Sequence, residues 1–153
     1  MRSTPDQHDP DWPKYPETIL RFASKPPLRI DLRAVPGDAE IAGLTSIGLA
    51  EPFVVMTAYD PRGENLSRDE NEERAARLDA RVREMGFAFT RVDACSPDGA
   101  HCECSIAVKM PREDAVKLAT EFEQMAIFWF DGSRFWIIGA WVKADPMMLP
   151  RSS

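Results

Sequence analysis

The chain from residue 53 onward predicts an α+β fold, a split βαβ (ferredoxin-like) two-layer sandwich with an extra C-terminal hairpin strand and an N-terminal extension. Strand-like and helix-like segments follow one another in the order β-α-β-β-α-β-β. Each helix-like segment carries one apolar stripe, so both helices can pack on one face of a sheet. Because crossover connections are right-handed, the split arrangement is the simplest way to join these elements.

The 153-residue chain divides into four segments and is long enough for one ordinary domain. Residues 1–16 contain four prolines, and we expect a tail or arm there. We expect residues 17–50 to form an N-terminal extension that packs on the domain. Residues 51–142 then hold the α+β core domain, and residues 143–153 form a C-terminal tail.

The extension contains two expected strands and a short helix. In the second strand, Leu28, Ile30 and Leu32 alternate with charged residues, which is the period-2 pattern of a half-buried strand. We expect Asp38 to cap the helix that follows and Gly48 to lie near its end.

The core domain begins with its clearest elements. The run FVVMTAY, residues 53–59, is rich in β-branched and aromatic side chains and predicts a strand. A helix over 68–85 follows, preceded by a Ser67–Glu70 capping box. Pro111 is expected at the first position of a second helix.

Residues 101–109 predict a strand that lies antiparallel beside strand 53–59. Alternation sends one set of side chains to the core face under the helices: Cys102, Cys104, Ile106, Val108 and Met110. The other set is expected on the open face of the sheet: His101, Glu103, Ser105 and Lys109.

A polar loop joins strand 53–59 to the first helix. Its residues Asp60-Pro61-Arg62-Gly63 favour a type I turn. Asn71 stands on the helix stripe that should face the core, and two interpretations stay open. Either its amide hydrogen-bonds the loop and fixes the loop's shape, or it faces a ligand near the helix N-terminus.

The expected pairing brings this loop to the start of strand 101–109, at one corner of the sheet. We interpret the corner as a candidate ligand-binding site, with a merely solvated sheet end as the alternative. The candidate residues are Tyr59, Asp60, Arg62, Asn65, Asn71, His101 and Glu103. An acid–base pair of His101 and Glu103 is chemically feasible, but no nucleophile completes it, so no catalytic residue is predicted.

Three sharper kinds of site are disfavoured. Ser105 and His101 stand about 13 Å apart along a strand, too far for a hydrolase triad. The cysteines lack a CxxC knuckle, which favours small buried thiols over a metal site. No Walker loop or GxGxxG motif indicates a nucleotide. We therefore expect no metal and no cofactor.

The composition narrows the function classes. The 25 acidic and 19 basic residues give a formal net charge of −6, which disfavours nucleic acid and anionic membranes as partners. No run of residues approaches the ~20 apolar positions of a membrane span. Three cysteines do not suggest a disulfide framework. We expect a soluble cytoplasmic protein.

The last hairpin turns at Asp131-Gly132-Ser133, and its strands are apolar on both faces. Such strands must be covered on both sides, and the helices cover only one. Residues 15–50 provide the second cover, or another protein or a second copy of the chain does. The aromatic residues that would then contact a partner are Phe128, Phe130, Trp136 and Trp141.

Four separated motifs lie between Phe53 and Trp136. They are the TAYDPRG turn, the Ser67-capped helix with Asn71, the strand SPDG…H-x-E-x-S and the segment Q-x-A-I-F-W. Together they resemble a family of bacterial proteins known only as a domain of unknown function. Asp60 departs from the resemblance, because the family usually has Asn there. The resemblance implies no activity, cofactor or partner.

Two functions are consistent with these features. The first is a non-catalytic binding or accessory module that engages a protein partner through the aromatic hairpin and its tails. The second is a small-molecule binding domain or small enzyme with a polar corner site at Arg62, Asn71, His101 and Glu103. We favour the first, because the sequence offers no evident nucleophile or metal set.

Overall fold

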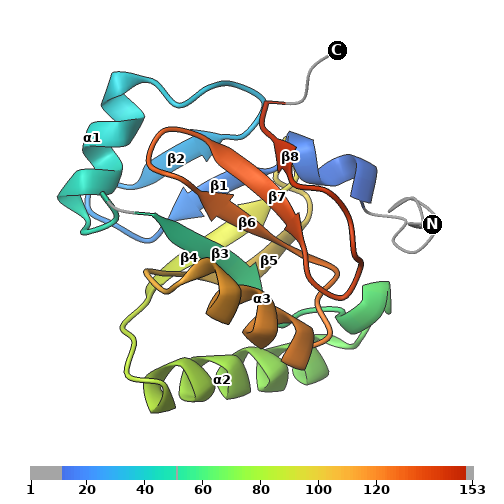
Figure 1. The fold of residues 1–153 in the computed structure, drawn as a ribbon. Helices are drawn as coiled ribbons and strands as arrows, with labels where there is room; N and C mark the ends of the chain where they lie inside the picture. Colours follow the sequence, from blue (N-terminus) through green and yellow to red (C-terminus); the bar gives the residue numbers. More distant parts are fainter. Residues whose placement is uncertain (1–11, 51, 151–153) are drawn as a thin grey trace.

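The computed structural model describes residues 12–50 and 52–150, which Figure 1 draws in colour. The parts of the expected arm and tail at 1–11 and 151–153 lie outside the described residues. The fold is α+β, as expected, with helices packed on an antiparallel sheet.

One antiparallel sheet of eight strands runs through the described part of the chain, in the order β2-β1-β4-β5-β3-β6-β7-β8. The strands are β1 (Ile19–Phe22), β2 (Leu28–Asp31), β3 (Phe53–Thr57), β4 (Thr90–Cys95), β5 (Cys102–Val108), β6 (Ala126–Phe130), β7 (Phe135–Gly139) and β8 (Met147–Met148). The helices are α1 (Asp38–Ser46), α2 (Arg68–Glu84) and α3 (Arg112–Glu121), with two short 3-10 turns, η2 (Trp12–Glu17) and η3 (Pro61–Gly63).

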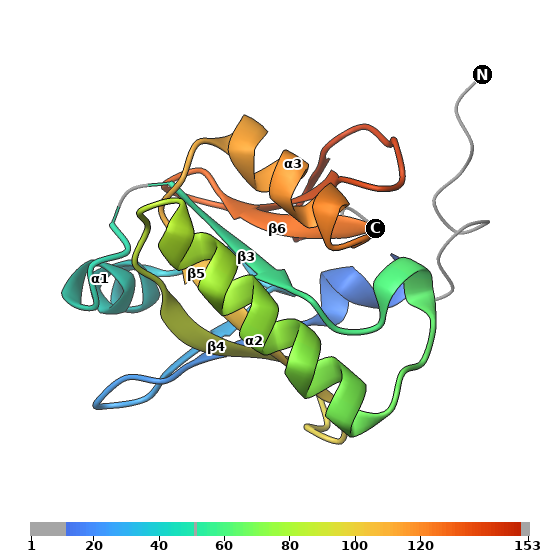
Figure 2. The same ribbon diagram turned by 90° about the horizontal axis from the view of Figure 1, so that it is seen from below.

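The two βαβ units of the core interleave. Strand β5 separates β3 from β4, and β3 separates β5 from β6. Helices α2 and α3 lie side by side on one face of the sheet, as Figure 2 shows from below. The expected antiparallel pairing of β3 with β5 is present, with Thr57 opposite Ser105.

The second face of the sheet is concave, because the sheet curls until its two ends share one core. Leu20 and Ile30 of the first strands pack in the same cluster as Ile137 of β7. The rings of Phe53 and Phe130 lie between them, 5.2 Å apart and fully buried. Burying such a side chain stabilises the fold by about 2–3 kcal/mol. The cover expected over this face therefore comes from the chain's own N-terminal segment.

Several details differ from the sequence predictions. The helix expected to be capped by Asp38 begins at Asp38, with Gly37 as its N-cap. Pro111, expected at the first position of the second helix, is its N-cap, and the helix begins at Arg112. The turn at 60–63 is not type I, because Arg62 has a left-handed backbone with φ of 54°. Part of the expected C-terminal tail forms β8 beside β7, and Leu149 after it is buried.

Another difference concerns β5. Ile106, Val108 and Met110 are buried under the helices as expected, but Cys102 is exposed and Cys104 is only half-buried. Apolar packing on the helix face thus covers the second half of this strand only. The opposite face is not open, since Ser105 is 2% exposed there.

The cysteines were expected as buried thiols, and for two of them this is wrong. Cys95 and Cys102 stand opposite each other on β4 and β5 and form a disulfide. Cys104 is a free thiol. The two bonded cysteines directly flank residues 96–101, where the Ser96 amide donates to the carbonyl oxygen of His101, and this symmetric spacing was the signal for the bond.

Candidate functional site

A pocket lies on the concave face of the sheet, between η2, β3, β5 and β6. Its volume is about 430 Å³ when the open mouth is included. The polar residues that line it are Thr57, Glu103, Ser105 and Gln124. The aromatic and apolar lining includes Tyr15, Val55, Ala94, Ala126, Phe128 and Ile137.

Strand register explains why these side chains meet. Thr57 stands opposite Ser105, and Glu103 stands opposite Ala94 of β4. Val55 is opposite Phe128 of β6. Because side chains two residues apart on a strand share a face, the polar and aromatic groups of three strands converge on the concave side.

The two pocket hydroxyls are held by the backbone. Thr57 Oγ1 donates to the carbonyl oxygen of Cys104 at 2.8 Å and accepts from the Tyr59 amide at 3.1 Å. Ser105 Oγ donates to the carbonyl oxygen of Glu103 at 3.1 Å. The hydroxyl protons therefore bind main-chain oxygens, and the Ser105 oxygen keeps its acceptor capacity.

Gln124 is buried and oriented by its own amide protons. Its Nε2 donates to the carbonyl oxygens of Tyr59 at 3.0 Å and Phe122 at 3.3 Å. Both protons of the amide nitrogen are thereby used, which leaves Oε1 as an acceptor.

Two aromatic rings form one wall of the pocket. Tyr15 of η2 and Phe128 of β6 meet edge to face, with their centroids 6.1 Å apart. This geometry is favourable for aromatic pairs and places η2 over the concave face.

The loop from Asp60 to Asn71 is fixed by reciprocal side-chain bonds. Asn71 Oδ1 accepts from the Asp60 amide at 2.9 Å, and Asn71 Nδ2 donates to Asp60 Oδ1 at 3.0 Å. The Leu66 amide donates to the same Asp60 oxygen at 3.0 Å. These bonds match the interpretation in which Asn71 fixes the loop, and the expected Ser67 capping box is present.

The same loop is tied to the connection between α3 and β6. Arg62 Nε pairs with Glu123 Oε2 at 2.9 Å, and its guanidinium lies 5.5 Å from the centroid of the Trp141 ring. Arg74 donates to the carbonyl oxygens of Ala58, at 2.7 Å, and Phe122. Burial lowers the pKa of Arg74, and these carbonyl bonds compensate for the buried charge.

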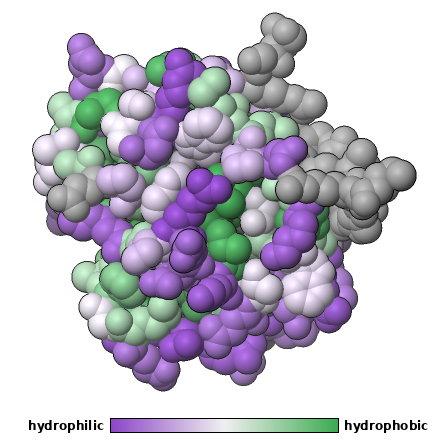
Figure 3. Space-filling view, in the orientation of Figure 1, coloured by the Kyte–Doolittle hydropathy of each residue, from purple (hydrophilic) through white to green (hydrophobic). Residues whose placement is uncertain are grey.

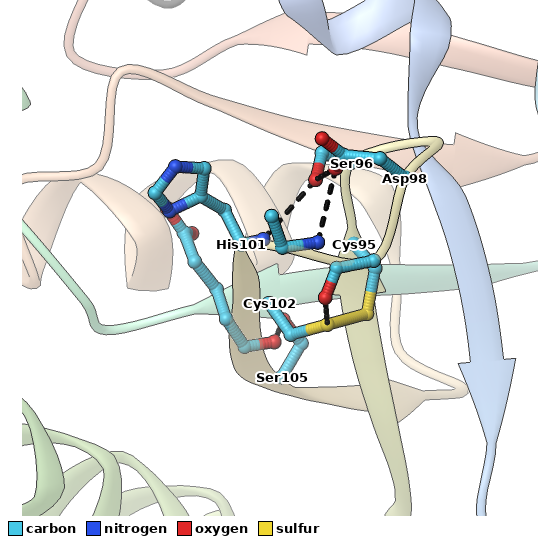
Figure 4. The surroundings of a disulfide bond; sticks show 9 residues. Cys95, Ser96, Asp98, His101, Cys102 and Ser105 are labelled. Atoms are coloured by element: carbon cyan, nitrogen blue, oxygen red, sulfur yellow. Dashed lines mark hydrogen bonds between the residues drawn. A yellow bond between two sulfur atoms is a disulfide. The ribbon is translucent and has the colours of Figure 1, made fainter.

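His101 belongs to a separate surface, the Ser96–Gly99 turn beside the disulfide. Its backbone amide donates to Ser96 Oγ at 3.1 Å, and Ser96 Oγ donates to Asp98 Oδ1 at 2.6 Å. The hydrogen bond from Ser96 lowers the pKa of Asp98. The exposed imidazole points away from the disulfide in Figure 4.

Tyr59 lies near Cys104, whose thiol is 3.2 Å from Arg91. Arg91 also pairs with Asp79 of α2 at 2.7 Å. Burial raises the pKa of the Cys104 thiol, against an opposing effect of Arg91.

The residues of the expected corner are therefore distributed over several places. Asp60, Arg62 and Asn71 belong to the loop network, while Asn65 is exposed in the same loop. Glu103 is the corner residue that lines the pocket.

Sequence reasoning missed Tyr15, Thr57, Ser105 and Gln124 as pocket residues. Gln124 had one signal, its place in the Q-x-A-I-F-W motif. Tyr15 had none, because its position depends on a contact with a residue more than a hundred positions away.

The expected partner-binding aromatics differ in exposure. Phe130 is fully buried, which contradicts a contact role, and Phe128 lines the pocket. Trp136 is half-buried and its Nε1 donates to Asp131 Oδ2 at 2.8 Å. Trp141 is 44% exposed.

Among residues 12–50 and 52–150, no group of three or more His, Cys, Asp and Glu side chains could hold a metal ion. None of the helices described there has the length and apolar character needed to span a membrane.

Residues 56–127 match a family described as "Protein of unknown function (DUF3293)". The match confirms the expected resemblance to an uncharacterised family. No curated protein and no solved structure matches the chain. The matched segment contains Thr57, Glu103, Ser105 and Gln124, whereas Tyr15 lies outside it.

Proposed function

We propose that this chain, whose residues 56–127 match a family of unknown function, is a non-catalytic module that binds a small ligand in the pocket of the concave face. The observation that carries the proposal is the placement of two buried polar side chains, Ser105 and Gln124, at that pocket. Ligand sites commonly combine an apolar and aromatic lining with a few oriented polar groups.

Packing alone does not require these polar groups. Ser105 is 2% exposed and Gln124 is 7% exposed, so each has lost nearly all contact with water. Their protons bond to backbone oxygens, while their side-chain oxygens keep acceptor capacity at the pocket. A ligand that donates hydrogen bonds would complete both groups.

The pocket chemistry favours binding over catalysis. A serine nucleophile needs a base that takes its proton, but the Ser105 proton is held by the carbonyl oxygen of Glu103. Thr57 likewise donates to a backbone oxygen.

A fragment screen by protein NMR tests the proposal. We expect compounds that bind to shift the amide signals of Thr57, Ser105 and Ala126, and not those of the exposed face of α2. Ala94→Leu fills the pocket from β4 and is expected to abolish these shifts. The matched control is Ala80→Leu on the exposed surface of α2, which should leave them unchanged. A diverse fragment set that shifts none of the pocket amides would refute the proposal.

A second candidate function is a non-catalytic module that binds a protein partner. Trp141 and Met148 favour it, since they are 44% and 40% exposed. Figure 3 shows no large apolar contact surface on the face it draws, because the hydrophobic areas there are small and separated by hydrophilic side chains. The test is a complex that co-purifies with the wild type, not with Trp141→Ala, and re-forms from the two purified proteins. Complex formation unaffected by Trp141→Ala would remove this surface from consideration.

The proposed location is the cytoplasm, on the basis of composition, and the disulfide provides a sharp test of it. Disulfides are rare in reducing compartments. Cells are quenched with acid to trap the thiols, and the denatured protein is then alkylated: all three cysteines should be labelled if the chain is cytoplasmic, and Cys104 alone if Cys95 and Cys102 were bonded. Labelling of Cys104 alone would place the protein in an oxidising compartment.

A further inference from the structure

We infer that the Cys95–Cys102 disulfide regulates the concave pocket, which binds its ligand more tightly in the oxidised protein than after a small thiol has reduced the bond. The inference rests on the proposed function and concerns the regulation of the same site. The exposure of the bond, its place in the sheet and its position next to the pocket wall lead to it.

One of the two bonded residues is open to attack from solution. Cys102 is exposed, whereas Cys95 is 2% exposed. An attacking thiolate therefore meets the sulfur of Cys102, and Cys95 becomes the leaving thiolate. The free thiol of Cys104 is half-buried, and burial raises its pKa, so it stays protonated and is a poor nucleophile. The reductant is then a thiol from solution.

Two exchange steps reduce the bond with a small thiol such as glutathione. First, a small thiolate attacks Cys102 Sγ, which forms a mixed disulfide and releases Cys95 as a thiolate. Second, another small thiolate attacks the sulfur of the bound small thiol and releases Cys102 as a thiolate. The chain gains two electrons and two protons, and the two small thiols become one small disulfide. In the cytoplasm, the proposed location, disulfides are usually catalytic or redox-sensing.

The bond joins β4 and β5 at an end of the sheet, as Figure 4 shows. The pairing of β3 with β5 ends at Thr57 opposite Ser105, and Thr57 Oγ1 reaches the carbonyl oxygen of Cys104. Residues 102–103 lie beyond these contacts, and among the described strands β4 is the one paired with them. Because the ends of a strand pair open more easily than its middle, the disulfide restrains the part of β5 that most needs a restraint.

This restrained end of the sheet carries part of the pocket wall. Ala94, directly before Cys95, lines the pocket, and so does Glu103. Glu103 directly follows Cys102 and stands opposite Ala94 in the strand pair. Since successive side chains point to opposite faces of a sheet, a bond on one face fixes the backbone that lines the pocket on the other. After reduction a ligand has to order this part of the wall as it binds, which weakens its affinity.

The test compares the oxidised wild-type protein with the protein reduced by glutathione in the absence of denaturant. Alkylation and mass spectrometry should then find labels on Cys95 and Cys102. The probe is the compound that gives the largest pocket shifts in the fragment screen. We expect it to bind the oxidised form about fivefold more tightly or better, the lower end of typical coupling between two sites. Amide hydrogen exchange of residues 102–104 should be faster in the reduced form, and that of β7 should not change.

Variants separate the bond from other effects of the reductant. The double variant with Cys95→Ala and Cys102→Ala should bind the probe as weakly as the reduced wild type, with or without glutathione. The matched control is Cys104→Ser, which keeps the disulfide and should respond to glutathione as the wild type does. By reciprocity, a saturating concentration of the probe should shift the glutathione equilibrium toward the oxidised form by the same factor.

The outcomes separate this inference from the proposed function. If the probe binds both forms equally, or the reduced form more tightly, the regulation is wrong and the ligand site stands. If glutathione reduces the bond only after the protein is unfolded, the disulfide is structural and the inference is overturned. If no fragment shifts the pocket amides in either form, both proposals fail.

Discussion

The two faces of the sheet are covered by different structural elements. On the helix face, Leu78 and Val82 of α2 pack with Leu118 of α3 in one cluster with residues of β3 and β5. On the concave face, Leu20 and Ile30 of the extension pack against strands near the other end of the chain. One face is closed by amphipathic helices, and the other by the curl of the sheet itself.

This difference explains where the pocket lies. A helix offers a continuous apolar stripe that follows a strand for its whole length. The concave face is covered near β3 by a 3-10 turn, whose Tyr15 reaches Phe128. Because η2 is short, it covers only part of the concave face, and the pocket lies beside it. Two polar residues of β5, Glu103 and Ser105, line that pocket.

The largest expected effect tests whether the core on the concave face contributes as much to the free energy of unfolding as the core under the helices. We expect Phe130→Ala to lower the free energy of unfolding by about 3–5 kcal/mol, because Phe130 is fully buried against Phe53 and Phe135. Leu118→Ala on the helix face should cost about 2–5 kcal/mol. Urea denaturation measures both. A loss below about 1 kcal/mol for Phe130→Ala would mean that the concave face is not a true core.

The next effect tests whether Asn71 fixes the loop between β3 and α2. Asn71→Ala removes both bonds to Asp60 and leaves the Asp60 amide without its partner, so we expect a loss of about 1–3 kcal/mol. Asn65→Ala, at an exposed position of the same loop, should stay within about 0.5 kcal/mol of the wild type. Equal losses for the two variants would deny Asn71 its role in fixing the loop.

A smaller effect is expected at the pocket itself. Ser105→Ala removes one local bond, to the Glu103 carbonyl oxygen, and should cost about 1 kcal/mol or less. The same variant should weaken any ligand that donates to Ser105 Oγ, as seen by NMR titration. A large loss of stability with unchanged ligand affinity would make Ser105 a structural residue.

The helix face of the sheet could be predicted from the sequence better than the concave face could. The limits of α2 followed from the Ser67–Glu70 capping box and one apolar stripe, since both signals are local. The pairing of β3 with β5 followed from the order of elements. Alternation correctly separated Ser105 from Ile106, but it could not show that the curl of the sheet buries Ser105.

The positions of Tyr15 and Gln124 were beyond local reasoning. Gln124 depends on a bond to Tyr59, and Tyr15 on a ring contact with Phe128, and no periodic pattern encodes such contacts. The left-handed backbone of Arg62 was also missed, because turn preferences favour Gly or Asn there. Its bonds to Glu123 hold that conformation in place.

The smallest expected effect concerns the hairpin between β6 and β7, whose strands contribute side chains to the cores on both faces of the sheet. Burial alone would raise the pKa of Asp131, but hydrogen bonds from the Arg134 amide, Trp136 Nε1 and Ser133 outweigh it and lower the pKa below its usual 3.8. A carboxyl whose pKa is lowered in the folded state contributes stability above its unfolded pKa. That contribution is lost as the pH falls through the lower, folded value.

We therefore expect the wild type to lose its stability advantage over Asp131→Asn as the pH falls from about 5 to about 2. Trp136→Phe removes one of the four donors to Asp131 and should reduce the same pH-dependent advantage in part. Urea denaturation across this range measures both differences. If the difference in free energy of unfolding between the wild type and Asp131→Asn stays constant with pH, the hydrogen bonds to Asp131 do not favour its ionised form. The hairpin turn would then be stabilised by its backbone geometry alone.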